Sequence, residues 1–280
     1  MDKNGLLMLK VLINQFNPKA GFALLKFLPQ DDVKELQELT VEAADLNPIL
    51  HHPKAYLGRL HYTWLKHALE KIPQETFPFI YSILSTEQRQ GIQPAARIIP
   101  LSEPVKNYFI NELYSQCEDT AHLPIEYLPK NELSPLLGYN KDKLVQLGSF
   151  LGLYDLANEV RTIVNKTHLK NFYSCLTPKQ FAFLKTCLQK KEIISVPKLS
   201  IDPSKQDCHR LKQILQHRGL LRLGKAISGM HPDFAWYVAH QLDMARGKIV
   251  MTSYAPQSEG KLTHYLKSQV VNLMNYLKDE

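Results

Sequence analysis

Residues 59–92, RLHYTWLKHALEKIPQETFPFIYSILSTEQRQGI, decide the fold class of the chain. Apolar residues recur at helical spacing over residues 60–72 and again over residues 77–84, which predicts two amphipathic helices. Ser85 and Gln88 then form a capping-box pattern, in which a serine and a glutamine three residues later cap the start of a third helix. Each predicted helix has one apolar face that it cannot bury alone, so the stretch predicts a stack of short helices.

The composition of the 280-residue chain is that of a globular protein. Apolar residues make up 44%, which is enough for a sizeable core, and the 22% of charged residues argues against a highly charged, disordered chain. Only 12 residues are glycine, which argues against glycine-rich phosphate loops. The formal net charge of +7 favours an acidic partner, whether nucleic acid, an anionic membrane or an acidic protein surface. We expect no membrane span and no signal peptide, because no apolar run has the required length or context.

The cysteines and histidines show no pattern typical of a catalytic or metal site. The four cysteines are widely spaced and form no CxxC pair: Cys117, Cys175, Cys187 and Cys208. We therefore expect neither a disulfide framework nor a zinc site, and a reducing cytoplasm is the simpler interpretation. With no HExxH and no GxSxG, the sequence predicts no enzyme, no metal and no cofactor. His240 and Asp243 form the best cluster, which we interpret as a helix cap or a solvated pair.

Prolines divide the chain into short helical segments. An apolar residue followed by a cap or proline and a polar pair occurs at Leu28 and, 44 residues later, at Ile72. This spacing indicates degenerate helical repeats, although any helical protein can reuse such helix starts. The predicted organisation is an N-terminal helical domain (1–92), a linker (93–104), a middle helical domain (105–195) and a C-terminal basic domain (196–280).

The C-terminal domain is predicted to mix helix and strand, so the expected fold class is all-α or mostly α with a small α+β C-terminal part. Glycine is expected to end helices at Gly152 and at Gly219. Residues 220–223 are then predicted to be a short strand or turn, and residues 248–254 are the one convincing strand candidate. The last helix has an apolar stripe over residues 262–277 and is interpreted as a core or docking helix.

The strongest functional signal is the basic segment 205–225, in which six cations stand against the single acid Asp207. A helix followed by glycine and Leu-Leu-Arg-Leu resembles the recognition helix and wing of a winged-helix domain, whose cations contact phosphate. A solvated helix face and a surface for an acidic protein are the alternatives. We predict a basic surface that attracts an acidic partner protein. The residues predicted to supply it are Lys190, Lys191, Arg210, Lys212, Arg218, Arg222 and Lys225.

Two regions resemble known families. Residues 21–39, GFALLKFLPQDDVKELQEL, and the unit around Trp64 resemble the opening and the middle domain of the flagellar motor switch protein FliG. Residues 152–166, GLYDLANEVRTIVNK, followed by residues 176–188, LTPKQFAFLKTCL, resemble the FliG-like or SctK-like proteins encoded with type III secretion genes in chlamydiae and relatives. The resemblance implies a bacterial, cytoplasmic, non-enzymatic scaffold at the base of a secretion apparatus, held at the inner membrane through its protein partners.

Overall fold

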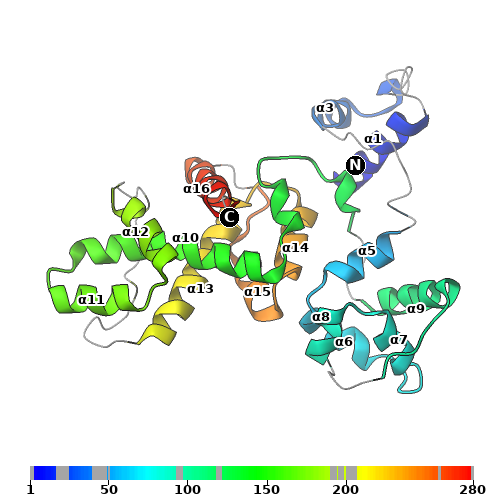
Figure 1. The fold of residues 1–280 in the computed structure, drawn as a ribbon. Coiled ribbons are helices and arrows are strands. Elements are labelled where there is room, and N and C mark those ends of the chain that lie inside the picture. Colours follow the sequence, from blue (N-terminus) through cyan, green and yellow to red (C-terminus); the bar gives the residue numbers. More distant parts are fainter. Residues whose placement is uncertain are drawn as a thin grey trace. The chain divides into compact units, whose positions relative to one another are not determined.

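The structure is a computed structural model that describes residues 3–16, 25–39, 49, 51–92, 97–117, 122–189, 194, 199, 207–257 and 260–278. Within these residues every regular element is a helix and none is a strand (Figure 1). The prediction of a mostly helical fold is confirmed, whereas the predicted strand component of the C-terminal part is wrong. None of the described helices has the length and hydropathy that crossing a membrane requires.

The first compact unit spans residues 1–137. Its helices are α1 (Lys3–Phe16), α3 (Gln30–Glu38), α5 (His52–Arg59), α6 (Tyr62–Glu70), α7 (Phe77–Ile83), α8 (Thr86–Ile92) and α9 (Glu103–Gln116), with short 3-10 helices η1 (Leu25–Phe27), η2 (Ile125–Tyr127) and η3 (Ser134–Gly138). Helix α9 packs against α5, α6 and α7, and α1 packs against α3 and η2. The short helices predicted from residues 59–92 therefore belong to one packed group.

The predicted capping box forms at the start of α8. The backbone N–H of Ser85 donates to Oε1 of Gln88 (3.0 Å), and the N–H of Gln88 donates to Oγ of Ser85 (3.3 Å). The Gln88 side chain is buried, and its Nε2 also donates to the carbonyl oxygens of Leu57 and Leu60 (2.7 and 2.8 Å). These carbonyls lie at the end of α5, where a helix leaves acceptors unsatisfied. One side chain thus caps α8 and completes the end of α5.

The second compact unit spans residues 138–280. Its helices are α10 (Lys141–Thr162), α11 (Lys166–Ser174), α12 (Pro178–Gln189), α13 (Cys208–Ala226), α14 (Pro232–His240), α15 (Met244–Ser253) and α16 (Lys261–Lys278). Helix α13 is its central element, because it packs against α10, α15 and α16 (Figure 1). Helix α10 also packs against α12 and α16.

The division between the units differs from the predicted domain boundaries. The predicted linker at residues 93–104 runs into the first two residues of α9, which packs within the first unit. The predicted boundary at residue 196 separates α10 from α13, although the most extensive helix contact of the second unit joins these two helices. Prolines mark where helices end, and helices end inside a packed unit as well as between units, so proline content alone does not locate a domain boundary.

Glycines bring the backbones of α10 and α13 into direct contact. A Cβ atom on Gly219 would lie 1.7 Å from the carbonyl oxygen of Gly148, and one on Gly152 would lie 2.1 Å from the carbonyl oxygen of Leu215. The prediction that Gly152 and Gly219 end helices is wrong, because α10 and α13 continue through them. At both positions the missing side chain serves close packing rather than a left-handed helix end.

Both predicted strands are helical. Residues 248–254 belong almost entirely to α15, where Val250 is buried, and the Asp243 side chain caps this helix by accepting a hydrogen bond from the N–H of Arg246 (3.3 Å). Residues 220–223 continue α13, and two of their leucines are fully buried. These predictions are wrong because a short apolar run has no periodicity that separates a strand from a buried helix.

Replacing Gly219 with alanine is expected to lower the free energy of unfolding of the second unit by about 3 kcal/mol. The added methyl group would overlap a backbone oxygen, which no side-chain rotation can move away. Urea unfolding followed by circular dichroism measures the change. The matched control is Gly58→Ala in α5, where nothing lies within 4 Å of the added Cβ and a gain of up to about 1 kcal/mol is expected. Equal effects of the two substitutions would contradict a backbone contact between α10 and α13.

Candidate functional site

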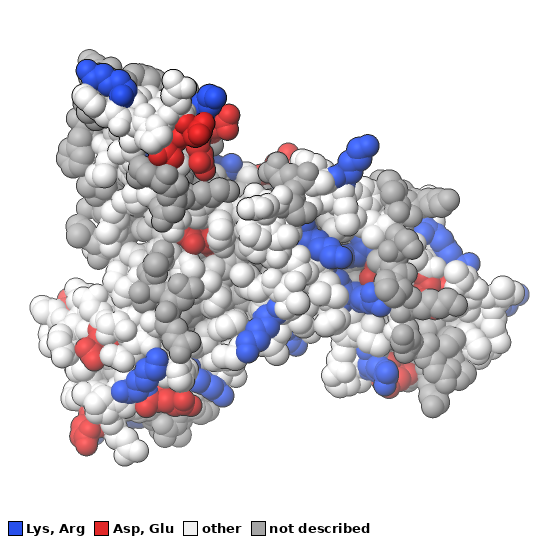
Figure 2. All heavy atoms as spheres, turned by 180° about the vertical axis from the view of Figure 1, so that it is seen from behind, with Lys and Arg blue, Asp and Glu red and all other residues white. Residues whose placement is uncertain are grey.

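The exposed side of α13 carries part of the predicted basic surface. Asp207 caps the helix, because its Oδ1 accepts a hydrogen bond from the backbone N–H of Arg210 (2.9 Å). The same helix contributes to the core, where Leu211 and Leu215 are each 1% exposed. Figure 2 shows Lys and Arg side chains spread over one face of the second unit, with few carboxylates among them. The structure therefore brings cations to the solvent side of a helix that is otherwise packed.

The predicted basic residues do not form one uniform group. Arg210, Lys212 and Lys225 are exposed, and Arg218 is half-buried. Lys190 and Lys191 lie outside the described residues. Three of the seven predicted residues thus present exposed charge on α13, and a fourth does so in part.

The prediction that Arg222 belongs to the basic surface is wrong, because its side chain is buried in the core. Its Nε donates to Oδ1 of Asp155 on α10 (2.9 Å), its Nη2 also pairs with this oxygen, and its Nη1 donates to Oε1 of Gln269 on α16 (2.9 Å). The guanidinium carbon lies 5.6 Å from the ring centre of Tyr154. Sequence alone could not reveal this, since a cation in a basic segment looks the same whether it faces water or a buried carboxylate. Arg222 joins three helices and is not part of a docking surface.

A pocket of about 440 Å³, open to solvent, lies on α11. It is lined by Lys166, Leu169, Lys170, Tyr173 and Ser174, which we call the α11 pocket. The first four share one helix face because they are spaced i, i+3, i+4 and i+7. Both lysines are exposed, whereas the leucine and the tyrosine are half-buried. This pocket was not predicted from the sequence, although residues 160–191 contain no Asp or Glu, which is a signal of a basic surface.

A disulfide joins the end of α11 to the start of α13. Cys175 follows α11 and Cys208 is the first residue of α13, and their Cα atoms are 4.9 Å apart. The prediction of no disulfide is wrong for this pair, because a separation of 33 residues forms no motif and only the fold brings the two helix ends together. Cysteine spacing therefore gives no support for a reducing compartment. The bond places the α11 pocket on the same part of the unit as the basic start of α13.

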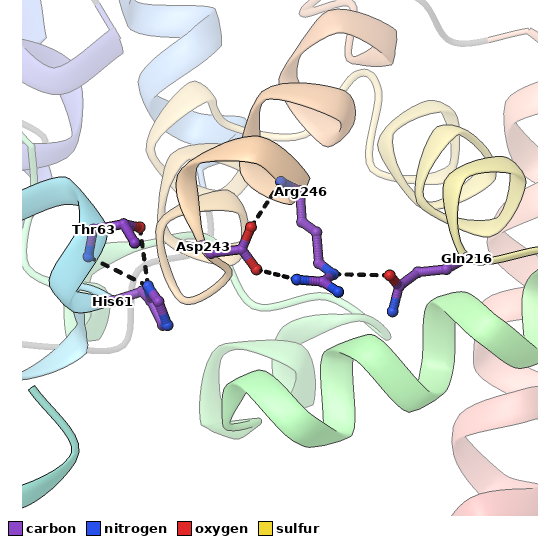
Figure 3. A network of polar contacts seen from close by, with 5 residues as sticks. All are labelled: His61, Thr63, Gln216, Asp243 and Arg246. Atoms are coloured by element: carbon purple, nitrogen blue, oxygen red, sulfur yellow. Dashed lines mark hydrogen bonds and ion pairs between the residues drawn. The ribbon is translucent and has the colours of Figure 1, made fainter. Parts of the chain in front are cut away.

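The histidine–carboxylate cluster considered in the sequence is a set of structural contacts. Asp243 caps α15 and pairs with Nη1 of Arg246 (2.5 Å), whose Nε donates to Oε1 of Gln216 on α13 (2.9 Å) (Figure 3). Burial acts to raise the pKa of Asp243, but the hydrogen bonds and the charge of Arg246 outweigh it and hold the pKa below its usual value. His240 stacks on Trp236, with ring centres 3.9 Å apart. The interpretation of Asp243 as a helix cap is confirmed.

His61, in the first unit, is also a helix cap. Its Nδ1 accepts a hydrogen bond from the backbone N–H of Thr63 at the start of α6 (3.3 Å), as the separate network in Figure 3 shows. A histidine ring at this position does the work that serine or aspartate usually does. Across the described ranges, no three His, Cys, Asp or Glu side chains gather in a way that could hold a metal ion.

Comparison of the chain with models of protein families, with curated proteins and with solved structures finds no match. The resemblance to FliG-like and SctK-like proteins accordingly stays an expectation drawn from the sequence. The site has to be interpreted from its own residues, which are the exposed cations of α13, the α11 pocket and the disulfide between them.

Replacing Arg222 with methionine is expected to lower the free energy of unfolding by about 3–5 kcal/mol, because Asp155 would remain buried without its counter-charge. Arg210→Met removes the same charge from the exposed side of the same helix, and its effect should stay within about 0.5 kcal/mol. The double variant Asp155→Leu/Arg222→Met replaces both partners of the buried pair by apolar groups and should recover most of the stability that Arg222→Met loses. Thermal and urea unfolding measure all three. A mild effect of Arg222→Met alone would contradict the buried pair.

Loss of the disulfide is expected to lower the free energy of unfolding of the oxidised protein by about 3–4 kcal/mol. The bond joins residues that are 33 positions apart, so it closes a loop of that length in the unfolded chain. Cys175→Ser and Cys208→Ser should show the same loss, and a reductant should destabilise the wild type but neither variant. Cys117→Ser is the control, because this cysteine is free. If the reductant leaves the stability of the wild type unchanged, the bond does not form in solution.

Proposed function

We propose that this protein is a non-enzymatic adaptor that binds acidic partner proteins through its second unit. The observation that carries the proposal is the exposed charge of α13, where Arg210 and Lys212 near the start and Lys225 near the end are exposed on a helix that buries Leu211 and Leu215. Residues 208–232 contain no Asp or Glu, so the charge along this helix has one sign. A surface whose charges have one sign attracts partners of the opposite charge and disfavours binding of partners with the same charge.

The scaffold supports a recognition role because it holds these charges in place. Helix α13 packs against α10, α15 and α16, and its first residue is covalently joined to Cys175. Little backbone freedom remains to be lost when a partner binds, which favours affinity. Complementary charge then acts mainly on the association rate, and apolar contacts determine how long the partner stays.

The kind of adaptor is proposed from the sequence resemblance. A FliG-like or SctK-like component would act in the bacterial cytoplasm as a scaffold of a type III secretion or flagellar apparatus, with other components of that apparatus as partners. In a reducing cytoplasm Cys175 and Cys208 would have to be thiols or be joined only transiently. Alkylation of thiols in living cells, followed by mass spectrometry of the peptides that contain these two cysteines, measures which form is present.

Nucleic-acid binding at residues 205–225 is the alternative that the sequence raised. The winged-helix interpretation required a strand after the helix, but residues 220–223 continue α13 and direct Leu220 and Leu223 into the core. The motif that motivated the alternative is therefore absent from this part of the described chain. The exposed cations still attract phosphate, so the experiment that tests the proposal includes an oligonucleotide.

The double variant Arg210→Glu/Lys212→Glu is expected to reduce the capture of acidic proteins from an extract of the source cells by about tenfold, because attraction becomes repulsion. Quantitative mass spectrometry of the captured proteins measures the loss, and raised salt should reproduce it with the wild type. The control Lys261→Glu/Lys278→Glu makes the same change of net charge on α16 and should capture the same proteins as the wild type.

Two outcomes would overturn the adaptor proposal. One is equal capture by the wild type and the α13 variant, which would show that the basic side of α13 is not the docking surface. The other is salt-sensitive binding of a duplex or single-stranded oligonucleotide that the α13 variant loses, with no acidic protein captured at all. Arg222 has no place in such a variant, because its substitution disturbs the core and would mimic a loss of binding.

A further inference from the structure

The outer face of α11 combines an apolar floor with two cations. The helix begins at Asn165, whose side chain accepts hydrogen bonds from the N–H groups of Thr167 and His168 (2.8 and 3.4 Å). Phe172 faces the core and is 4% exposed. The pocket lies on a different face, where Leu169 and Tyr173 form its apolar floor beside Lys166 and Lys170. An apolar floor that is half-buried on a surface helix is suited to contact with a partner.

An aromatic wall extends the floor onto α12. The ring of Tyr173 meets the ring of Phe181 edge to face, with centres 5.0 Å apart. The Lys185 ammonium lies 4.6 Å from the centre of the Phe181 ring. Val164, two residues before α11 in the chain, is 94% exposed. The two helices therefore present apolar and aromatic side chains edged by lysines.

The charge around this floor has one sign along the chain. Residues 160–191 contain no Asp or Glu, and their cations are Arg161, Lys166, Lys170, Lys179, Lys185, Lys190 and Lys191. The ammonium groups of Lys166 and Lys170 make no ion pair or hydrogen bond with any side chain in the described part of the chain. Two exposed cations beside an apolar floor are complementary to a ligand that has carboxylates beside an apolar group.

We propose that the α11 pocket binds an acidic amphipathic helix of a partner protein. One apolar side chain of that helix contacts Leu169 and Tyr173, and two carboxylates about one turn apart pair with Lys166 and Lys170. Lys166 and Lys170 are four residues apart, which is about 6 Å or one helical turn along α11 and matches that spacing. The pocket would be the specific part of the basic surface, so this inference rests on the proposed adaptor function and names its partner.

The floor favours a helix over other anionic ligands. The polar side chains that line this pocket are those of the two lysines, Tyr173 and Ser174. The Ser174 hydroxyl already donates to the carbonyl oxygen of Asn171 (2.9 Å). Selective contact with a phosphate or a base edge relies on several directed polar groups, which this lining does not offer. An apolar side chain gains most from the floor, because it removes Leu169 and Tyr173 from water.

The first unit supplies a matched control. A second pocket of about 480 Å³ is lined by Leu25, Lys26, Leu28, Gln30, Val33, Lys34 and Gln37, so it also has two lysines beside apolar residues. Unlike α11, the adjoining helix α3 carries carboxylates, which are Asp31, Asp32, Glu35 and Glu38. We expect no preference for an acidic helix there, because these carboxylates repel it.

The experiment selects binders from a displayed library of helical peptides with the full-length protein as bait. The expected binders share an apolar residue and, beside it on the same face, two Asp or Glu residues about one turn apart. Fluorescence anisotropy of the selected peptides then gives dissociation constants. Lys166→Glu/Lys170→Glu is expected to weaken binding at least about tenfold, and Leu169→Gln, which keeps the charge, should weaken it about as much. The control Lys26→Glu/Lys34→Glu should leave binding within about twofold of wild type.

Two results of the peptide experiment would overturn the inference. One is a selection without acidic, apolar helices, and the other is equal affinity of the selected peptides for the wild type and for the Lys166→Glu/Lys170→Glu variant. Displacement of the peptides by an oligonucleotide or by phosphatidylserine vesicles, with tighter binding of that competitor, would assign the pocket to another ligand class. Protein capture that depends on Arg210 and Lys212 but not on the α11 pocket would overturn this inference alone. If protein capture depends neither on Arg210 and Lys212 nor on the α11 pocket, the proposed adaptor function is overturned as well.

Discussion

The second unit depends on the backbone contact between α10 and α13. Gly148 and Gly152 on one helix meet Gly219 on the other, with no room for a Cβ atom at Gly152 or Gly219. This close approach brings Asp155 within reach of Arg222, so that a charge in the C-terminal part of α13 is neutralised inside the core. Burying such a pair contributes little stability by itself, but removing either partner is costly, which makes it a strong constraint on how the two helices align.

Helix α13 serves as core and as surface because of this alignment. Its buried residues are mainly leucines, glycines and one paired arginine, and its exposed residues include Arg210, Lys212 and Lys225. The disulfide between Cys175 and Cys208 extends the arrangement to α11, whose outer face holds apolar and cationic side chains together. The recognition surface is thus fixed to the most buried element of the unit. Such support is what a binding surface needs in order to keep its charges in register with a partner.

The sequence predicts the features that depend on local patterns. The helical class, the apolar stripes and the Ser85–Gln88 capping box all follow from spacing within a few residues, and the structure confirms them. The errors concern features that depend on distant contacts. Gly219 looks like a helix end until α10 is placed against it, and Arg222 looks exposed until Asp155 faces it. Cysteine pairing is of the same kind, since it requires helices from separate parts of the chain to be placed first.

The glycine contact also bears on how the protein can change over generations. Because main-chain atoms meet main-chain atoms there, the spacing of α10 and α13 does not depend on the size of any side chain at the crossing. Substitutions on the outer faces of α11 and α13 can therefore alter the choice of partner while the framework beneath them stays the same. The crossing itself has almost no such latitude. On α13, the exposed positions can therefore vary, whereas Gly219 at the crossing cannot.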